Sequence, residues 1–343
     1  MRTELRIAIC LLLLACPALA AEAAKTAPVF KVTALVSNQP GQAKVTDPNL
    51  VNAWGLSQGP GKDPIWVSDA GTGLSTVYDQ KTGENTGLVV TIPDGGPTGT
   101  VYVPSGTGFV ITENGKSGDA YFLFDSFTGV ISGWNPTVDS ANAVIAYNGS
   151  AQGSSYTGLA IDPSSKLLFA ADFANNQVQI FDNQFDLTGS FTDTSLPKGF
   201  APYNVAIFNG DVYVVFAAGG SPGAHRPPKR ERGYVDVFTE SGTLVKQLIA
   251  NGPLDGPWGM AIAPSTFGTF ANSLLVGNLD DGKINAFDPS SGAFLGTLSG
   301  KNGRPIVIDG LWALDAVPTG DLTFSAGPEG YSAGLLGLIS IKK

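Results

Sequence analysis

Residues 157–192 read TGLAIDPSSKLLFAADFANNQVQIFDNQFDLTGSFT and contain one complete copy of the repeat that decides the fold. Apolar residues occupy every second position in Leu159–Ile161 and Val178–Ile180, which is the period of a strand that packs on one face. Turn-forming residues, such as Asp162-Pro163-Ser164-Ser165, separate the strand-like runs. The stretch therefore predicts four strands joined by hairpins, at 157–162, 167–172, 177–182 and 187–192.

An aromatic residue followed by a small polar turn recurs along the chain every 46 to 57 residues. The five copies are Tyr78-Asp79 to Gly83, Phe124-Asp125 to Gly129, Phe181-Asp182 to Asp186, Phe238-Thr239 to Gly242 and Phe287-Asp288 to Gly292. A strand-rich repeat of this length, punctuated by glycine and proline, is typical of the four-stranded blades of a β-propeller. We assign the strands of the second blade to 100–103, 108–112, 121–124 and 130–134.

Three further strands, at 311–314, 322–325 and 335–341, form most of a sixth blade, after which the chain stops. The outer strand of this blade is expected near the other terminus, at 30–36, where the sequence is FKVTALV. Pairing that strand with the C-terminal one removes two exposed sheet edges. The sequence therefore predicts an all-β fold, a six-bladed β-propeller closed by an N-terminal strand that completes the last blade.

The first twenty residues have the pattern of a signal peptide. A basic start is followed by an apolar run and a small-residue cleavage site, which are Arg2 and Arg6, Ile7–Leu14, and Ala18-Leu19-Ala20. We expect a signal peptide at 1–20, a flexible segment at 21–28 and a single propeller at 29–343, in a secreted or periplasmic protein. The alternative is a lipid anchor on Cys16, because Leu13-Leu14-Ala15-Cys16 also resembles a bacterial lipobox.

Removal of residues 1–20 leaves 18 basic and 28 acidic residues, a net charge of about −10. Such a charge repels phosphate backbones, so nucleic acid is not an expected partner. After the signal segment, no apolar run reaches the length of about 20 residues that a membrane helix needs. We expect a monomer whose partner is a small molecule, a glycan or another protein.

Several strings resemble a largely uncharacterised family of secreted bacterial six-bladed β-propellers related to NHL-repeat proteins. They are Asn52–Leu56, Gly256–Ala261, Leu274–Asn278 with Asp281–Asp288, and Ile308–Leu314. The resemblance covers essentially the whole chain after the signal segment, and it implies a fold and export but no reaction. The sequence departs from that family at Glu329–Gly334, where a His-Gly pair is often found.

Acidic and amide residues recur at the turns between second and third strands. The set is Asp69, Glu113, Asn114, Asp172, Asn175, Asn176, Asn278, Asp280, Asp281 and Glu329. These turns gather on one face of a propeller, and converging oxygens of this kind are the ligands of Ca²⁺. Glu113, Asn175, Asn204 and Asp280 are the candidate ligands. The alternative is that aspartate and asparagine serve only the tight hairpins.

Aromatic residues occupy similar positions near the starts of five inner strands, and polar residues lie beside them. Trp54, Tyr156, Tyr203, Trp258 and Trp312, with Asn52 and Asn204, are the candidate ligand-binding residues. Aromatic walls with a few polar groups suit a small molecule or a sugar. The alternative for the aromatic residues is packing between blades.

His225 is the one histidine of the chain, and it stands in a basic insertion, Gly223–Arg232. The insertion separates two strands of the fourth blade, so we expect a surface loop. A single histidine cannot form a histidine-rich metal site.

Two functional hypotheses follow, and the sequence leaves open whether the protein is an enzyme. The first is a binding or scaffold propeller without catalytic residues. The second is a Ca²⁺-dependent hydrolase of the lactonase or esterase type, in which the cation polarises a carbonyl group. A lyase or quinoprotein-like oxidoreductase on this fold normally needs a channel histidine, for which His225 is the one candidate.

Overall fold

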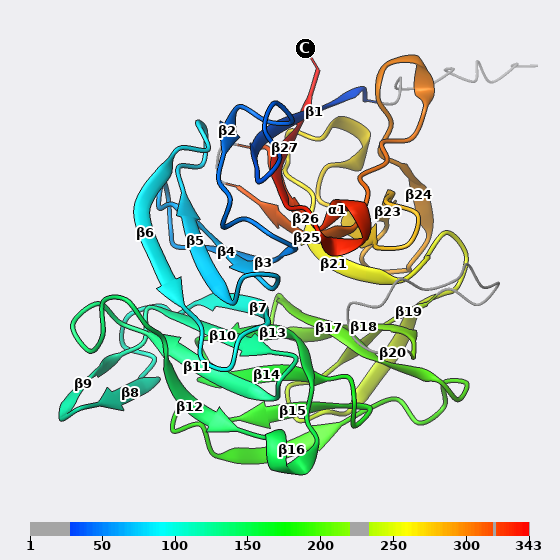
Figure 1. The fold of residues 1–343 in the computed structure, drawn as a ribbon. Coiled ribbons are helices and arrows are strands. Elements are labelled where there is room, and N and C mark those ends of the chain that lie inside the picture. Colours follow the sequence, from blue (N-terminus) through cyan, green and yellow to red (C-terminus); the bar gives the residue numbers. More distant parts are fainter. Residues whose placement is uncertain (1–27, 220–232, 318–319, 343) are drawn as a thin grey trace, which may run out of the picture.

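Six sheets, five of four strands and one of five, surround a central axis in the computed structural model. The structure describes residues 28–219, 233–317 and 320–342. Figure 1 shows the sheets as successive blades around the ring, so the predicted six-bladed β-propeller is confirmed. The predicted signal segment with Cys16 and the insertion with His225 lie outside the described residues.

Every blade begins with an inner strand at the axis and ends with an outer strand at the rim (Figure 1). Blade one contains β3 (Ala53–Gln58), β4 (Ile65–Asp69), β5 (Leu74–Tyr78) and β6 (Asn85–Thr91). Blade two contains β7 (Pro97–Tyr102), β10 (Phe122–Ser126), β11 (Val130–Trp134) and β12 (Val144–Asn148). Blade three contains β13 (Tyr156–Asp162), β14 (Leu167–Asp172), β15 (Gln177–Phe181) and β16 (Leu187–Phe191).

The remaining blades follow the same order. Blade four contains β17 (Phe200–Phe208), β18 (Asp211–Ala218), β19 (Tyr234–Phe238) and β20 (Leu244–Ala250). Blade five contains β21 (Pro257–Ile262), β22 (Leu274–Asn278), β23 (Ile284–Phe287) and β24 (Phe294–Thr297). Blade six contains β25 (Leu311–Ala316), β26 (Leu322–Ala326), β27 (Leu335–Ile341) and β1 (Phe30–Ser37), extended by β2 (Val45–Thr46).

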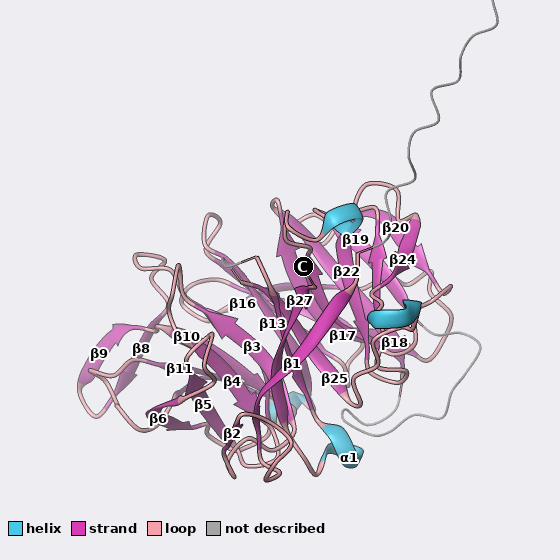
Figure 2. Ribbon diagram, turned by 90° about the horizontal axis from the view of Figure 1, so that it is seen from above, coloured by secondary structure: helices cyan, strands magenta, loops and turns pink. Residues whose placement is uncertain are grey.

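In the described part of the chain, helical structure is confined to short turns between strands, as Figure 2 shows. Three are 3-10 turns, at Ser150–Gln152, Gly268–Phe270 and Lys301–Gly303, and the fourth is α1 (Pro328–Tyr331). None of the described helices is long and apolar enough to cross a membrane.

The N-terminal strand closes the ring, as the sequence predicts. β1 pairs antiparallel with β27, from Phe30 opposite Ile341 to Ser37 opposite Leu335. A bulge between Ala34 and Val36 interrupts the register. Blade six is therefore built from both ends of the chain, and two sheet edges that would otherwise be exposed are paired.

The second blade differs from its sequence-based assignment. Residues 108–112 are not its second strand, because β8 (Val110–Glu113) pairs only with β9 (Lys116–Asp119) in a separate hairpin. Asn114 and Gly115 form the two-residue turn, with φ of 50° and 77°, which an Asn-Gly pair adopts readily. The second, third and outer strands are instead β10, β11 and β12.

One of the five aromatic turns occupies a different place in its blade from the other four. Phe124-Asp125 lies at the end of a second strand, whereas the other four copies lie between a third strand and an outer strand.

The two faces of the propeller carry different turns. We call the face with the turns that follow the inner strands, such as residues 59–64 after β3, the entry face. The opposite face carries the turns between second and third strands, such as residues 173–176 after β14, and is called the closed face. The β8–β9 hairpin follows the inner strand β7 and therefore belongs to the entry face.

Each of the six inner strands contains a β-bulge near its start. In β21, for example, Pro257 pairs with Asn278 and Met260 pairs with Val276, so the inner strand has one extra residue between these pairs. We call the residue after the first paired residue, Trp258 in β21, the bulged residue. In four blades a glycine follows it, and these glycines are Gly55, Gly99, Gly158 and Gly259. An added Cβ would meet the next blade at each of the four, and at Gly259 it would lie 2.5 Å from the carbonyl oxygen of Trp312. The bulge therefore lets the backbones of adjacent inner strands approach closely.

We predict that Gly259→Ala lowers the free energy of unfolding by about 1–3 kcal/mol, because the new methyl group must displace the backbone of β25. Urea denaturation measures the change. Gly189→Ala is the matched control, since its Cβ meets only Ile180 Cδ1, at the ordinary contact distance of 3.8 Å. Equal effects of the two substitutions would show that the close approach does not limit stability.

Candidate functional site: the central channel

Four large aromatic side chains fill the channel at the level of the bulge, and we call them the aromatic plug. They are Trp54, Tyr203, Trp258 and Trp312, which occupy the same register position in blades one, four, five and six. The indoles of Trp54 and Trp312 stack with ring centroids 3.7 Å apart, and both residues are at most 1% exposed. Tyr331 of α1 lies over Trp312 from the closed face, with centroids 5.6 Å apart.

Hydrogen bonds fix the orientation of two of these rings. Trp258 Nε1 donates to the carbonyl oxygen of Thr157 at 2.8 Å, and Trp312 Nε1 donates to Asn52 Oδ1 at 2.9 Å. Asn204 Nδ2 donates to the carbonyl oxygen of Trp258 at 2.9 Å. Asn52 and Asn204 thus hold the plug in place, and Asn52 adopts φ of 50°, a conformation that asparagine tolerates.

Tyr156 is the one candidate ligand-binding residue that lies apart from the plug. It precedes the plug position, which Thr157 occupies in blade three, and it packs between blades two and three. Its hydroxyl donates to Gln179 Oε1 at 2.6 Å. The structure therefore brings together six of the seven candidate ligand-binding residues, around a buried plug rather than an open rim, and a direct contact of these six with a ligand stays a prediction.

A cavity of about 710 Å³ lies on the entry side of the plug. All six inner strands contribute to its wall, and Gly59 and Pro60 of the turn after β3 extend it to the entry face. The residues three positions beyond the plug level are small in five blades: Ser57, Val101, Ala160, Ala206 and Ala261. The first four of them line the cavity. Small side chains leave the channel open at this level. The tryptophans close it at the plug, which lies about 10 Å away along the axis, because three residues of a strand rise about 3.3 Å each.

Asp315 is the one charged residue among the described residues that line this cavity. It occupies in blade six the level at which the other blades have the small residues. Burial raises the pKa of the Asp315 carboxyl to about 7, and a hydrogen bond from the Ala316 backbone opposes this rise only in part. A carboxyl group with a raised pKa in a concave, largely apolar site is a candidate functional group.

Asp315 was not predicted as a site residue, because only the starts of the inner strands were compared. The signal lies three residues after Trp312, since Leu314-Asp315-Ala316 aligns with Leu56-Ser57-Gln58 and Leu159-Ala160-Ile161. An acidic residue at a position that is otherwise small or apolar predicts a role beyond packing.

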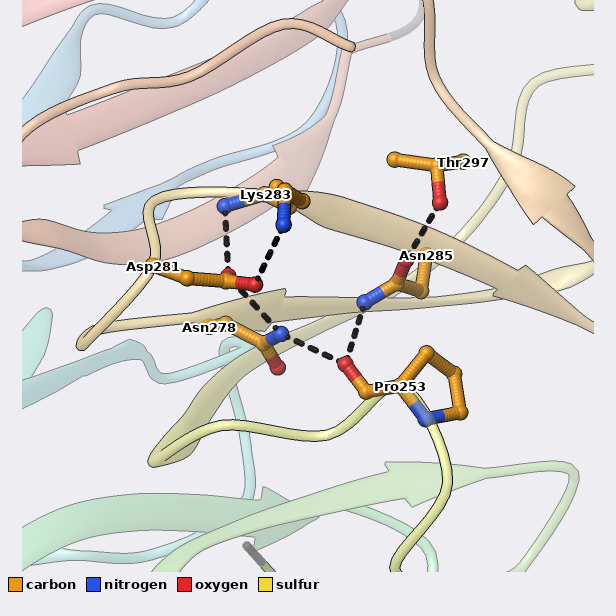
Figure 3. A network of polar contacts seen from close by, with 6 residues as sticks. All are labelled: Pro253, Asn278, Asp281, Lys283, Asn285 and Thr297. Carbon is orange, nitrogen blue, oxygen red and sulfur yellow. Dashed lines mark hydrogen bonds and ion pairs between the residues drawn. The ribbon is translucent and has the colours of Figure 1, made fainter. Parts of the chain in front are cut away.

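The acidic and amide residues of the second-to-third strand turns are largely engaged in the fold itself. Asp69, Asp172 and Asn278 are fully buried. Figure 3 shows how Asn278 Nδ2 and Asn285 Nδ2 both donate to the carbonyl oxygen of Pro253, at 2.8 and 3.0 Å. Lys283 Nζ contacts Asp281 Oδ2 at 3.0 Å, and Thr297 Oγ1 donates to Asn285 Oδ1 at 2.7 Å. The network ties blade five to the segment that enters it from blade four.

The four candidate cation ligands are not brought together. Glu113 lies in the β8–β9 hairpin on the entry face, because the strands of blade two were assigned incorrectly from the sequence. Asn175 and Asp280 lie in turns of the closed face, and Asn204 lies in the inner strand β17. Asn175 Nδ2 donates to Asp172 Oδ2 at 2.8 Å. Across residues 28–219, 233–317 and 320–342, no group of three or more His, Cys, Asp or Glu side chains is arranged to hold a metal ion.

Two buried carboxyl groups face each other between blades three and four. Asp236 of β19 is 0% exposed, and Asp193, in the segment after β16, is 6% exposed. Burial and the neighbouring Asp193 carboxylate raise the pKa of Asp236 to about 8. The equivalent third-strand residue of blade five is Asn285, whose amide donates to a backbone carbonyl oxygen.

The uncharacterized proteins R648 and L690 of Acanthamoeba polyphaga mimivirus are each 31% identical to this chain. The matches cover 90% of the chain and 80% and 85% of the two viral proteins. The chain belongs to the same family as R648 and L690. No protein-family model matches it. Membership of the family of secreted bacterial six-bladed β-propellers, which the sequence resembles, stays a prediction.

Solved structures with the same fold include enzymes. A glucose dehydrogenase is 14% identical, with a TM-score of 0.55, over 91% of this chain and 100% of that one. A catalytically inactive virginiamycin B lyase from Staphylococcus aureus is 12% identical, with a TM-score of 0.53, and the match also covers 91% of this chain and 100% of that one. At these identities the similarity shows the propeller fold alone.

We predict that Trp54→Ala lowers the free energy of unfolding by about 3–5 kcal/mol, because it leaves a large void beside Trp312. Phe294→Ala, at a side chain that is 51% exposed in β24, is the control and should cost less than about 1 kcal/mol. Denaturant unfolding compares the two. A Trp54→Ala protein as stable as the wild type would contradict a packing role for the plug.

We also predict a pH-dependent effect of Asp236→Asn. A carboxyl whose pKa rises from 3.8 to about 8 on folding binds its proton more tightly in the folded state. The free energy of unfolding therefore falls as the pH rises from about 4 to about 8. Asp236→Asn should be more stable than the wild type by about 1–3 kcal/mol at pH 8.5, and by much less at pH 5.

Thermal unfolding of both proteins at the two pH values measures this difference. Asp288→Asn is the control, because hydrogen bonds from Ser290 and Ser291 lower the pKa of that exposed carboxyl to about 2. Its effect should not change between pH 5 and pH 8.5. A pH-independent effect of Asp236→Asn would refute the assignment.

Proposed function

We propose that this protein is a binding module whose central channel takes a small organic molecule from the entry face. The observation that carries the proposal is a cavity of about 710 Å³, sealed at one end by the aromatic plug and walled by six inner strands. Cavities of about 300–1,000 Å³ with apolar walls and a few polar groups are typical of small-molecule sites.

The composition of the wall supports this function. Leu56, Leu159, Val205 and Met260 give it an apolar surface, with Trp258 contributing from the plug. Asp315 adds a polar group that can orient a ligand, while the Asn204 amide supports the wall through its hydrogen bond to Trp258. The wall is built on strands rather than on loops, so its shape is set before a ligand arrives.

We favour binding over Ca²⁺-dependent hydrolysis because the four candidate cation ligands are distributed over both faces and the interior. The dehydrogenase and lyase activities named for structural neighbours belong to those proteins. Among the described residues of the channel wall, the ionisable side chains are Asp315 and Tyr102. The Asp315 carboxyl group gives the channel a means of recognising a ligand.

A substitution that fills the channel tests this proposal. Ala206→Phe places a ring at the level of Asp315, on the opposite side of the axis from β3, and should abolish binding of compounds that the wild type binds. A library of small organic molecules is screened by saturation-transfer NMR and by the shift in melting temperature.

Ala293→Phe is the control, because Ala293 is an exposed residue of the turn between β23 and β24. Compounds that bind Ala206→Phe and Ala293→Phe equally well would show that they bind outside the channel. A library that yields no compound sensitive to Ala206→Phe would overturn the proposal.

A further inference from the structure

The carboxyl group of Asp315 has no opposite charge beside it in the described part of the chain. Among the described residues, an ion pair joins Lys283 to Asp281 in blade five, and none involves Asp315. The protein as a whole is acidic, with a net charge of −9. An uncompensated carboxylate in an apolar environment is costly, unless a partner of opposite charge arrives with the ligand.

Other polar groups of the wall already have protein partners. Ser57 Oγ accepts a hydrogen bond from the Tyr102 backbone at 2.7 Å, and Gln58 Oε1 accepts one from Gln80 at 2.7 Å. The Asn204 amide donates to Trp258 and accepts from the Val205 backbone. These groups support the wall, and their polar atoms are not available as the main contacts of a ligand.

One unsatisfied hydroxyl group lies beside Asp315. Thr323 stands directly opposite Asp315 on the neighbouring strand β26, so the two side chains share one face of the blade. Its Oγ1 is buried without a hydrogen-bond partner among the described residues, and Thr323 does not line the cavity. The ionised carboxylate of Asp315 only accepts hydrogen bonds, so it favours a ligand group with several N–H donors.

The rest of the wall distinguishes an organic cation from a metal ion. Ca²⁺ needs about 6–8 oxygen ligands, whereas the wall around Asp315 consists mainly of Val101, Ala160, Ala206 and Leu314. The indole of Trp258, at the plug end of the cavity, adds an apolar surface for the uncharged part of such a ligand.

Building on the proposed function, we propose that the ligand of the channel is a small organic amine, whose protonated nitrogen pairs with Asp315. Its apolar part occupies the space between Asp315 and the plug, in contact with Leu56, Leu159 and Met260. The carboxylate sets the selectivity for the cation, while the apolar wall contributes non-directional affinity.

Matched pairs of probes separate these two contributions. Phenethylamine is compared with 2-phenylethanol, and cyclohexylmethylamine with cyclohexylmethanol, by isothermal titration and saturation-transfer NMR at pH 8. Each pair has the same apolar part and differs in the cationic group. The amines should bind the wild type at least tenfold more tightly than the alcohols.

Asp315→Asn removes the charge at nearly constant volume, and it should reduce amine affinity at least tenfold while changing alcohol affinity less than twofold. Because the substitution removes a charge that has no opposite charge beside it, the variant is expected to fold, and its melting temperature verifies this. Asp186→Asn is the control for net charge, since Asp186 is an exposed residue of the turn between β15 and β16. It should leave both affinities unchanged.

The outcomes distinguish the inference from the function on which it rests. Alcohols that bind as tightly as the amines, or amines whose affinity survives Asp315→Asn, would overturn the pairing but leave small-molecule binding intact. If neither class binds the wild type and no library compound is sensitive to Ala206→Phe, both proposals fail.

Discussion

Neighbouring inner strands meet backbone to backbone at the bulge, and this contact sets the dimensions of the channel. Glycine at Gly55, Gly99, Gly158 and Gly259 removes the Cβ that would hold the strands apart. The residues at the bulge then lie close to the axis, where Trp54, Tyr203, Trp258 and Trp312 fill the narrowed space. Widening the ring at the bulge would loosen the plug, and with it the floor of the cavity.

Side-chain hydrogen bonds reinforce the same ring from blade to blade. Ser325 Oγ donates to the carbonyl oxygen of Trp54, and Thr98 Oγ1 donates to that of Tyr156 at 3.0 Å. The buried Asp125 carboxylate accepts bonds from Thr98 Oγ1 and from the Gly99 backbone, while burial raises its pKa to about 6. These polar groups near the axis thus hold neighbouring blades together. Asp315 differs from them, because no hydrogen bond or ion pair in the described part of the chain joins its carboxyl group to another blade, and this difference supports a role in binding a ligand.

Much of the fold could be predicted from the sequence because strand periodicity and turn residues are local signals. Blade three and the closure by residues 30–36 depend on such signals, and both are confirmed. Blade two was wrong in its strand order because a hairpin insertion has the same local pattern as two blade strands. Asn114-Gly115 was the signal that could have identified it.

The candidate site was less predictable because its geometry depends on contacts across the axis. The equivalent positions of the tryptophans could be recognised in the sequence of each inner strand. Their burial, and the hydrogen bond from Trp258 to Thr157 of blade three, could not be predicted from the sequence of any single strand. Asp315 could be found only by comparing all six inner strands at one level.

The joint between β1 and β27 has a consequence for how the molecule opens. Phe30 and Ile341 are paired although almost the whole chain separates them, and bringing two such distant segments together costs about 5 kcal/mol of chain entropy. Both cysteines of the sequence, Cys10 and Cys16, precede this joint, so hydrogen bonds and apolar contacts alone hold it. The seam between β1 and β27 is therefore where thermal opening and proteolysis of the ring should begin. Asp315 lies in the same blade, on β25, which β26 separates from this seam.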